Sequence, residues 1–363
     1  MTRLRVVYLL GTGATQAEVN LKDDTIHILM KDIREGILKK IDEYEISELY
    51  EVRTELSKGE MDVEHLITLY ESTGINKHII IARKLKQLFM QEIQEKITKL
   101  GRNYIPKLLP ALIDMHQIPS LNEKLFGIIT INYEDIIDRA IQIVNKGINY
   151  SIKMKKSHRY LRIKPSSIPL LKLHGSFNWK NELPVRLTDD NLRKPEDALW
   201  IPPGVEKTNV RYPFNILWGR AIEILNCDIL RIIGCSLSRN DWHLVSLLYT
   251  TQKLNFKKKS YDIELIDYSN EGEKIRKSYP YLSFRLISEI KEVRESLIKS
   301  YSLDTSSTEK LSKSIGSLLE YSDKKVHNIF DIWLRAKGEY LKDRSKPIKT
   351  KTRIFENYIN EVT

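Results

Sequence analysis

The chain alternates between short, mostly apolar runs, each ending near glycine or polar residues, and longer amphipathic segments with helical spacing. Continuous apolar runs of this kind are typical of strands buried on both faces of a parallel sheet. They lie at Leu4–Leu10, Phe126–Ile131, Ile168–Leu173, Ile229–Ile233, Asp262–Ile266 and Leu282–Ile287. Segments that predict helices lie between them at 134–144, 215–225 and 241–254. The alternation predicts an α/β fold with an open, doubly wound, mostly parallel sheet that helices cover on both faces.

Two further parts of the chain show only helical periodicity. After the first predicted strand, apolar residues recur at every fourth position in several stretches as far as Ile118, which predicts a large helical insertion. Beyond Ser288 the pattern is helical again and ends in a basic tail. The expected domains are therefore a Rossmann-like domain formed by residues 1–20 and 120–290, a helical insertion at 21–119, and a helical C-terminal extension at 291–363.

Composition and charge narrow the class of protein. Of the 363 residues, 41% are hydrophobic and 29% are charged, which suffices for a sizeable core and excludes a disordered chain. No apolar run approaches the roughly 20 residues of a membrane span, so no membrane association is expected. The two cysteines, Cys227 and Cys235, exclude a disulfide framework and a cysteine-built zinc site, and they favour a cytoplasmic location. The net charge of +11 favours anionic partners, with nucleic acid among them.

Glycine and polar residues follow most of the predicted strands. Because ligands bind at the carboxyl ends of the strands in open α/β sheets, these residues form the candidate site. A glycine loop can offer backbone N–H groups to an anion, and a histidine at a strand end can transfer a proton near neutral pH. The glycines could instead serve only a tight turn, and the asparagine could cap the next helix. The candidate residues are Gly11, Thr12, Gly13, Ala14, Thr130, Asn132, His174, Gly175, Gly234, Ser236, Leu237 and Asp267.

In their order and spacing, these motifs resemble the sirtuin-like family of NAD-binding proteins. The motifs read GTGAT, TINY, LHGS and GCSLS, and the resemblance covers residues 1–20 and 120–290. It implies that NAD is the substrate, that Asn132 orients the nicotinamide ribose and the water, and that His174 is the general base. The residues that it places around NAD are Gly11, Thr12, Gly13 and Ala14 at the pyrophosphate, Thr130 beside Asn132, Gly234, Ser236 and Leu237 at phosphate and ribose, and Asp267 at the adenosine ribose.

The sequence departs from the deacylating members of that family. Those carry a four-cysteine zinc module and an arginine-bearing loop after the first glycine motif, and neither is recognisable here. The chain instead resembles the prokaryotic antiphage branch, whose sirtuin-like domains hydrolyse NAD to ADP-ribose and nicotinamide. This resemblance implies an NAD hydrolase that needs no metal and acts in antiviral defence by depleting NAD. It also implies a homo-oligomer and a HerA-type ATPase as partner.

Other functions stay open at this point. The same pocket could sense NAD or ADP-ribose without turnover and gate a partner ATPase or nuclease. The basic charge could mark a nucleic-acid-binding subunit, whose affinity would fall steeply with salt. Protein deacylation is disfavoured, because the zinc module and the arginine-bearing loop are missing. The helical additions favour self-assembly, although their apolar faces could equally pack within one chain.

Overall fold

The computed structural model describes most of the chain, with gaps between the described segments. The described residues are 3–101, 104–118, 121–144, 147–155, 167–188, 194–203, 211–238, 241–255, 261–288, 291–293, 295–296, 329–344 and 353–360. The basic tail and the 257–259 lysines therefore lie largely or wholly outside the described residues.

A seven-stranded sheet in the order β10-β9-β8-β1-β2-β4-β3 forms the centre of the fold, and every neighbouring pair in it is parallel. The predicted α/β fold with a mostly parallel sheet is confirmed. The strand β1 is central, and its residues from Val6 to Leu10 are buried, because strands and helices surround it. The strands are β1 (Leu4–Leu10), β2 (Glu123–Thr130), β3 (Ile148–Asn149), β4 (Ile168–Lys172), β8 (Ile229–Ile233), β9 (Asp262–Ile266) and β10 (Phe284–Ile287).

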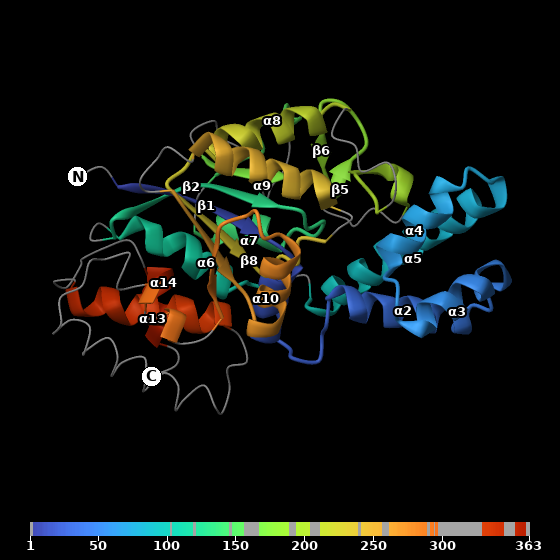
Figure 1. Cartoon of the computed structure of the whole chain (residues 1–363), viewed down its shortest axis with the longest axis horizontal. Coiled ribbons are helices and arrows are strands. Elements are labelled where there is room, and N and C mark those ends of the chain that lie inside the picture. Colours follow the sequence, from blue (N-terminus) through green and yellow to red (C-terminus); the bar gives the residue numbers. More distant parts are fainter. Residues whose placement is uncertain are drawn as a thin grey trace.

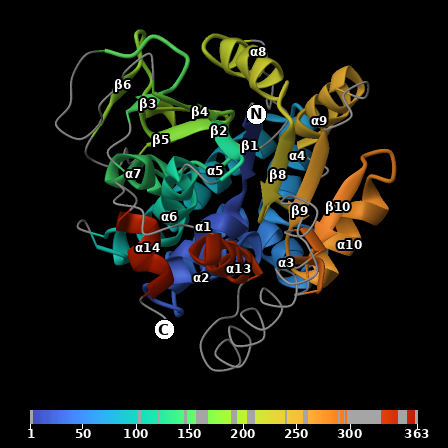
Figure 2. The same ribbon diagram turned by 90° about the vertical axis from the view of Figure 1, so that its left-hand side faces the viewer.

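Helices cover both faces of this sheet. Figure 2 shows α8 and α9 on one side of the strands and α6, α7, α13 and α14 on the other. One continuous hydrophobic core joins these helices to the strands. The helices around the sheet are α1 (Thr12–Asn20), α6 (Leu108–Asp114), α7 (Ile136–Ile143), α8 (Phe214–Ile224), α9 (Trp242–Asn255), α10 (Ser269–Ser278), α13 (Ile329–Arg344) and α14 (Arg353–Asn360).

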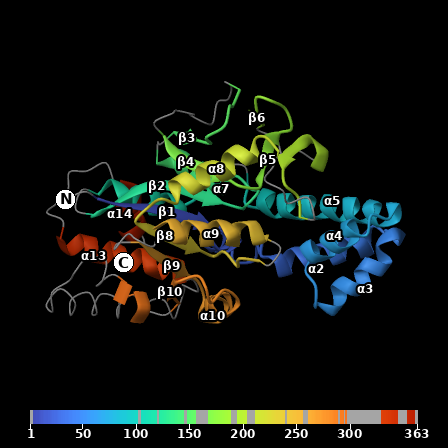
Figure 3. The ribbon, with the colours of Figure 1, turned by 45° about the horizontal axis from the view of Figure 1, so that its top comes forward.

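The predicted helical insertion forms an arm that extends past the carboxyl ends of the strands (Figures 1 and 3). We call α2 to α5 the helical arm; its helices are α2 (Met30–Glu43), α3 (Tyr50–Lys58), α4 (Val63–Ser72) and α5 (Asn76–Lys99). The arm has its own apolar core, which also takes in Tyr133, Phe177 and Trp200 from outside it. The helix α6 lies within the predicted insertion but packs in the main core under the sheet.

A second, antiparallel sheet follows β4 directly and is not predicted by the sequence pattern. It has the order β6-β5-β7, with β5 (Gly175–Lys180), β6 (Arg186–Leu187) and β7 (Ala198–Trp200). Its strands are short, and two of them have too few residues to show the alternation that identifies a half-buried strand.

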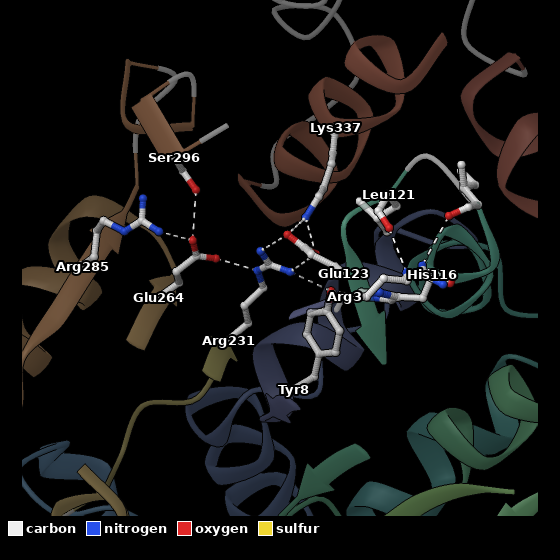
Figure 4. A network of polar contacts seen from close by, with 11 residues as sticks. Arg3, Tyr8, His116, Leu121, Glu123, Arg231, Glu264, Arg285, Ser296 and Lys337 are labelled. Carbon is white, nitrogen blue, oxygen red and sulfur yellow. Dashed lines mark hydrogen bonds and ion pairs between the residues drawn. The ribbon is translucent and has the colours of Figure 1, made fainter. Parts of the chain in front are cut away.

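A buried network of charges attaches α13 to the sheet (Figure 4). The guanidinium of Arg231, in β8, forms two hydrogen bonds of 2.7 and 2.8 Å to the Glu123 carboxylate and one of 2.5 Å to Glu264. From α13, Lys337 Nζ lies 2.8 and 2.9 Å from the two Glu123 oxygens, and Arg285 pairs with Glu264. Each carboxylate thus meets two cations, which compensates the cost of burying these charges.

His116 lies beside this network and is buried with it. Its Nε2 is 2.9 Å from the Tyr8 hydroxyl, and burial lowers the pKa of His116 from 6.5 to about 3. Between these two values the unfolded chain binds a proton that the folded chain does not, so stability falls as the pH falls. We expect the free energy of unfolding to drop by about 2 kcal/mol through His116 between about pH 8 and about pH 5.

Urea unfolding at the two pH values measures this effect. The variant His116→Gln keeps an acceptor for Tyr8 but cannot titrate, so its loss of stability in acid should be smaller by about that amount. An equal loss in both proteins would contradict the assignment.

Candidate active site

The predicted glycine loop after β1 is instead the start of α1, with Gly11 as N-cap, and three glycines allow it to contact the loop after β8. A Cβ atom on Gly13 would lie 2.7 Å from the Cα of Gly234, and one on Gly234 would lie 2.3 Å from the Ala14 nitrogen. Gly234 also has a φ of +56°, which favours glycine. The Gly13 N–H donates to the Gly234 carbonyl at 2.8 Å. The Ala14 N–H donates to the Gly11 carbonyl at 3.0 Å. Backbone packing therefore accounts for these glycines, and their contact with a pyrophosphate stays a prediction.

Asn132 is held by α1 and does not cap the helix that follows it. The N-cap of α7 is Asp135. The Asn132 amide nitrogen donates to the Thr15 hydroxyl at 2.9 Å, and the Thr12 hydroxyl lies 3.4 Å from the amide oxygen. The backbone N–H of Asn132 donates to Thr130 Oγ1 at 3.0 Å. The side chain is 4% exposed, and these contacts fix its orientation at the end of β2.

Glu134 adds a carboxyl group beside Asn132 that the sequence did not mark as a site residue. Its Oε1 accepts a hydrogen bond of 2.7 Å from the Thr15 hydroxyl, which also accepts from Asn132. Burial raises the pKa of Glu134, while the nearby Lys172 ammonium opposes that rise. The Thr15 hydroxyl thus joins the Glu134 carboxyl to the Asn132 amide at the end of β2.

His174 lies at the end of β4, and its imidazole contacts two aromatic rings. The ring centroid of Tyr133 is 6.1 Å away in a stacked arrangement, and that of Trp218 is 6.4 Å away. The residue is 4% exposed. Gly175 follows with a φ of +74°, and a Cβ there would lie 2.3 Å from the Leu199 carbonyl oxygen, so the turn into β5 requires glycine. Tyr133 directly follows Asn132, so this ring connects the end of β2 to His174.

Asp241 faces His174 and is the second residue that sequence reasoning missed. Its Oδ1 lies 3.7 Å from His174 Nε2, and Asp241 is 6% exposed. The sequence marked Asp241 only as the start of a helix; the available signal was an acid that follows a GxSL motif within one short loop. A buried carboxylate at this distance stabilises the protonated imidazole and orients its ring.

The remaining predicted residues lie on the loops after β8 and β9. Ser236 is exposed, whereas the Leu237 side chain is 2% exposed and packs in the main core. Between Gly234 and Ser236, burial raises the pKa of the Cys235 thiol to about 12, which makes it a poor nucleophile at neutral pH. Asp267 is half-buried at the end of β9, where burial raises the pKa of its carboxyl to about 6. Its contact with an adenosine ribose stays a prediction.

Neither a metal site nor a membrane span is found in the described part of the chain. Within the described ranges, no three His, Cys, Asp or Glu side chains gather as metal ligands would. Among the helices that the structure describes, none combines the length and the apolar character needed to cross a bilayer.

Comparison with known proteins gives a likeness of fold. No protein-family model matches the chain, and no curated protein sequence matches it. Among solved structures, the chain is similar to a Sir2 homologue mutant in complex with ADP-ribose, at 14% identity and a TM-score of 0.38, covering 82% of this chain and 91% of that one. It is also similar to a Sir2 mutant with a p53 peptide and NAD, at 10% identity and a TM-score of 0.34, covering 82% and 94%. Both likenesses are weak, so the functional argument rests on the residues described above.

Proposed function

We propose that the chain is an NAD hydrolase that cleaves NAD to ADP-ribose and nicotinamide. One observation carries this proposal: the four motifs lie at the carboxyl ends of β8, β1, β2 and β4, which are four consecutive strands of the sheet. The strand order thus brings together motifs that are spread along the chain from Gly11 to Ser238. It forms one polar edge that contains Asn132, His174 and Asp241.

The residues at this edge suit the hydrolysis of an N-glycosidic bond. A water oxygen bonds to the anomeric carbon of the nicotinamide ribose, and the bond to nicotinamide breaks with its electron pair leaving on the nicotinamide nitrogen. The proton of the water passes to His174, and Asp241 stabilises the resulting imidazolium. Asn132 holds the ribose and the water, since its amide is fixed by Thr12 and Thr15. Positioning and exclusion of bulk solvent supply most of the effect.

The proposed setting is antiviral defence through NAD depletion. The chain would act as a homo-oligomer together with a HerA-type ATPase, which would control when NAD is cleaved. This setting rests on the resemblance of the motifs to the antiphage branch of the sirtuin-like family.

Product analysis of NAD incubated with the purified protein, alone and with a HerA-type ATPase, tests the activity. Nicotinamide and ADP-ribose should appear in equal amounts with the wild-type chain. Asn132→Ala should lose both products, because the ribose and the water are no longer positioned. Asn76→Ala is the matched control, since Asn76 is exposed on the helical arm.

Two outcomes separate the proposal from its alternative. Full product formation by Asn132→Ala would contradict the proposed site. NAD that binds to the wild type but remains intact in every assembly would favour a sensor that gates a partner ATPase or nuclease.

A further inference from the structure

A pocket of about 540 Å³ lies outside the strand-end site, between α9 and the segment that joins α10 to β10. Figure 2 shows α9 and α10 beside the strands β9 and β10 at one edge of the sheet. The volume falls in the range of about 300–1,000 Å³ that is usual for small-molecule pockets. Its lining residues are Trp242, Val245, Ser246, Tyr249, Tyr279 and Tyr281.

Aromatic rings dominate this pocket, and three of them are open to solvent. Trp242 is 62% exposed, Tyr281 51% and Tyr249 40%. The rings of Tyr249 and Tyr281 meet at 86° with centroids 5.6 Å apart, so they form a corner. Single exposed aromatic residues need no explanation, but several around one hollow offer faces on which a flat ring can stack.

The Lys253 ammonium beside the pocket favours flat ligands that carry a negative charge. Lys253 lies one turn after Tyr249 on α9, and its Nζ is 5.3 Å from the centroid of the Tyr249 ring. None of the lining residues that the structure describes is acidic. A cationic ligand would therefore meet Lys253 without a compensating carboxylate, whereas an anionic group would be attracted.

We propose that this aromatic pocket binds a planar heteroaromatic ring that carries an anionic group, the chemistry of a mononucleotide. The ring stacks against Trp242, Tyr249 and Tyr281, and its phosphate lies toward Lys253. Stacking of a base on aromatic side chains together with a nearby cation is a common way to hold nucleotides without reading their sequence.

The pocket is linked to the strand-end site in two ways, by adjacent residues of the chain and by a hydrogen bond. Trp242 directly follows Asp241, which faces His174. The Tyr279 hydroxyl donates to the Leu237 carbonyl at 2.6 Å, and Leu237 has a φ of +48°, an unfavourable value for leucine. A ligand that moves Trp242 or Tyr279 therefore changes the position of Asp241 or of the loop after β8. This effect on NAD turnover rests on the proposed function, whereas the binding itself does not.

Fluorine NMR of the full chain labelled with 5-fluorotryptophan tests the binding, with AMP as the probe. The chain has five tryptophans, and the variant Trp242→Phe assigns the Trp242 signal. AMP in the aromatic pocket should shift the Trp242 signal in a saturable way. AMP in the strand-end site should instead shift the Trp218 signal, because Trp218 contacts His174.

Variants and a second probe make the result specific. Tyr281→Ala should weaken the AMP effect on Trp242 by about tenfold or more, because a stacking face is lost. Tyr50→Ala, at a tyrosine of the helical arm that is 50% exposed, should leave it unchanged. Ribose 5-phosphate, which lacks the ring, should not shift Trp242 at the same concentrations.

Three results would overturn the proposal. They are an unmoved Trp242 signal at millimolar AMP, an equal response to ribose 5-phosphate, and tight binding of a thymidine oligonucleotide at Trp242 without any response to AMP. The Asn132→Ala variant should retain the AMP effect on Trp242, so failure of the proposed NAD hydrolysis and failure of this pocket are distinguishable.

Discussion

His174→Ala is expected to lower the turnover of NAD by about 10²–10⁴-fold, because the water loses the base that accepts its proton. NAD binding should change much less, since the glycine loops and Asn132 remain. Separate measurements of kcat and of the dissociation constant for NAD check this split. His65→Ala, an exposed histidine on the helical arm, is the matched control. Unchanged turnover in His174→Ala would remove His174 from the mechanism.

Asp241→Asn tests the pairing of Asp241 with His174. Without the carboxylate, the imidazolium that forms during turnover loses its counter-charge, so kcat should fall, by less than in His174→Ala, while NAD binding changes little. Asp241→Glu, which keeps the charge, should retain more of kcat than Asp241→Asn. An equal loss of kcat in both variants would show that Asp241 only supports the local fold.

Glu123→Gln is expected to destabilise the fold by about 3–5 kcal/mol, the usual effect of removing one partner from a buried ion pair. The substitution leaves Arg231 and Lys337 within the core without the carboxylate that both of them contact. Urea unfolding followed by circular dichroism measures the change. The loss should be the same with and without substitution of Asn132, because Glu123 lies at the opposite end of β2 from Thr130 and Asn132.

Two further variants keep this prediction testable. Glu43→Gln breaks an exposed pair with Lys39 and should change the unfolding free energy by less than about 1 kcal/mol. Lys337→Met removes one cation while Glu123 keeps Arg231, so it should be milder than Glu123→Gln and remain measurable if the latter does not fold. Equal unfolding curves for Glu123→Gln and Glu43→Gln would contradict the role of the network.

The sequence predicted the main sheet well because its strands are buried on both faces. Six apolar runs correspond to β1, β2, β4, β8, β9 and β10. The strands β3, β5, β6 and β7 were not predicted, because pairing with other segments defines them more than any local pattern does. The arginine within the run 229–233 could be seen, but its partners in β2 and β9 could not.

The candidate site was predicted as a set of strand ends, and its contacts were not. Parallel strands place their carboxyl ends on one edge, so Asn132 and His174 could be grouped from sequence alone. Asp241 and Glu134 could not be assigned, since their roles depend on burial and on which side chain faces them. The Asn132 cap, an open alternative at the sequence level, is replaced by contacts with Thr12 and Thr15.

The helical arm shares its apolar core with the aromatic residues around His174. Tyr133 stacks on His174, and it packs together with Phe177, Trp200 and Phe89 of α5. Removing the arm would expose these rings to water and take away one wall of the histidine's surroundings. A variant without the arm would therefore lack packing around His174 that the sheet alone does not supply.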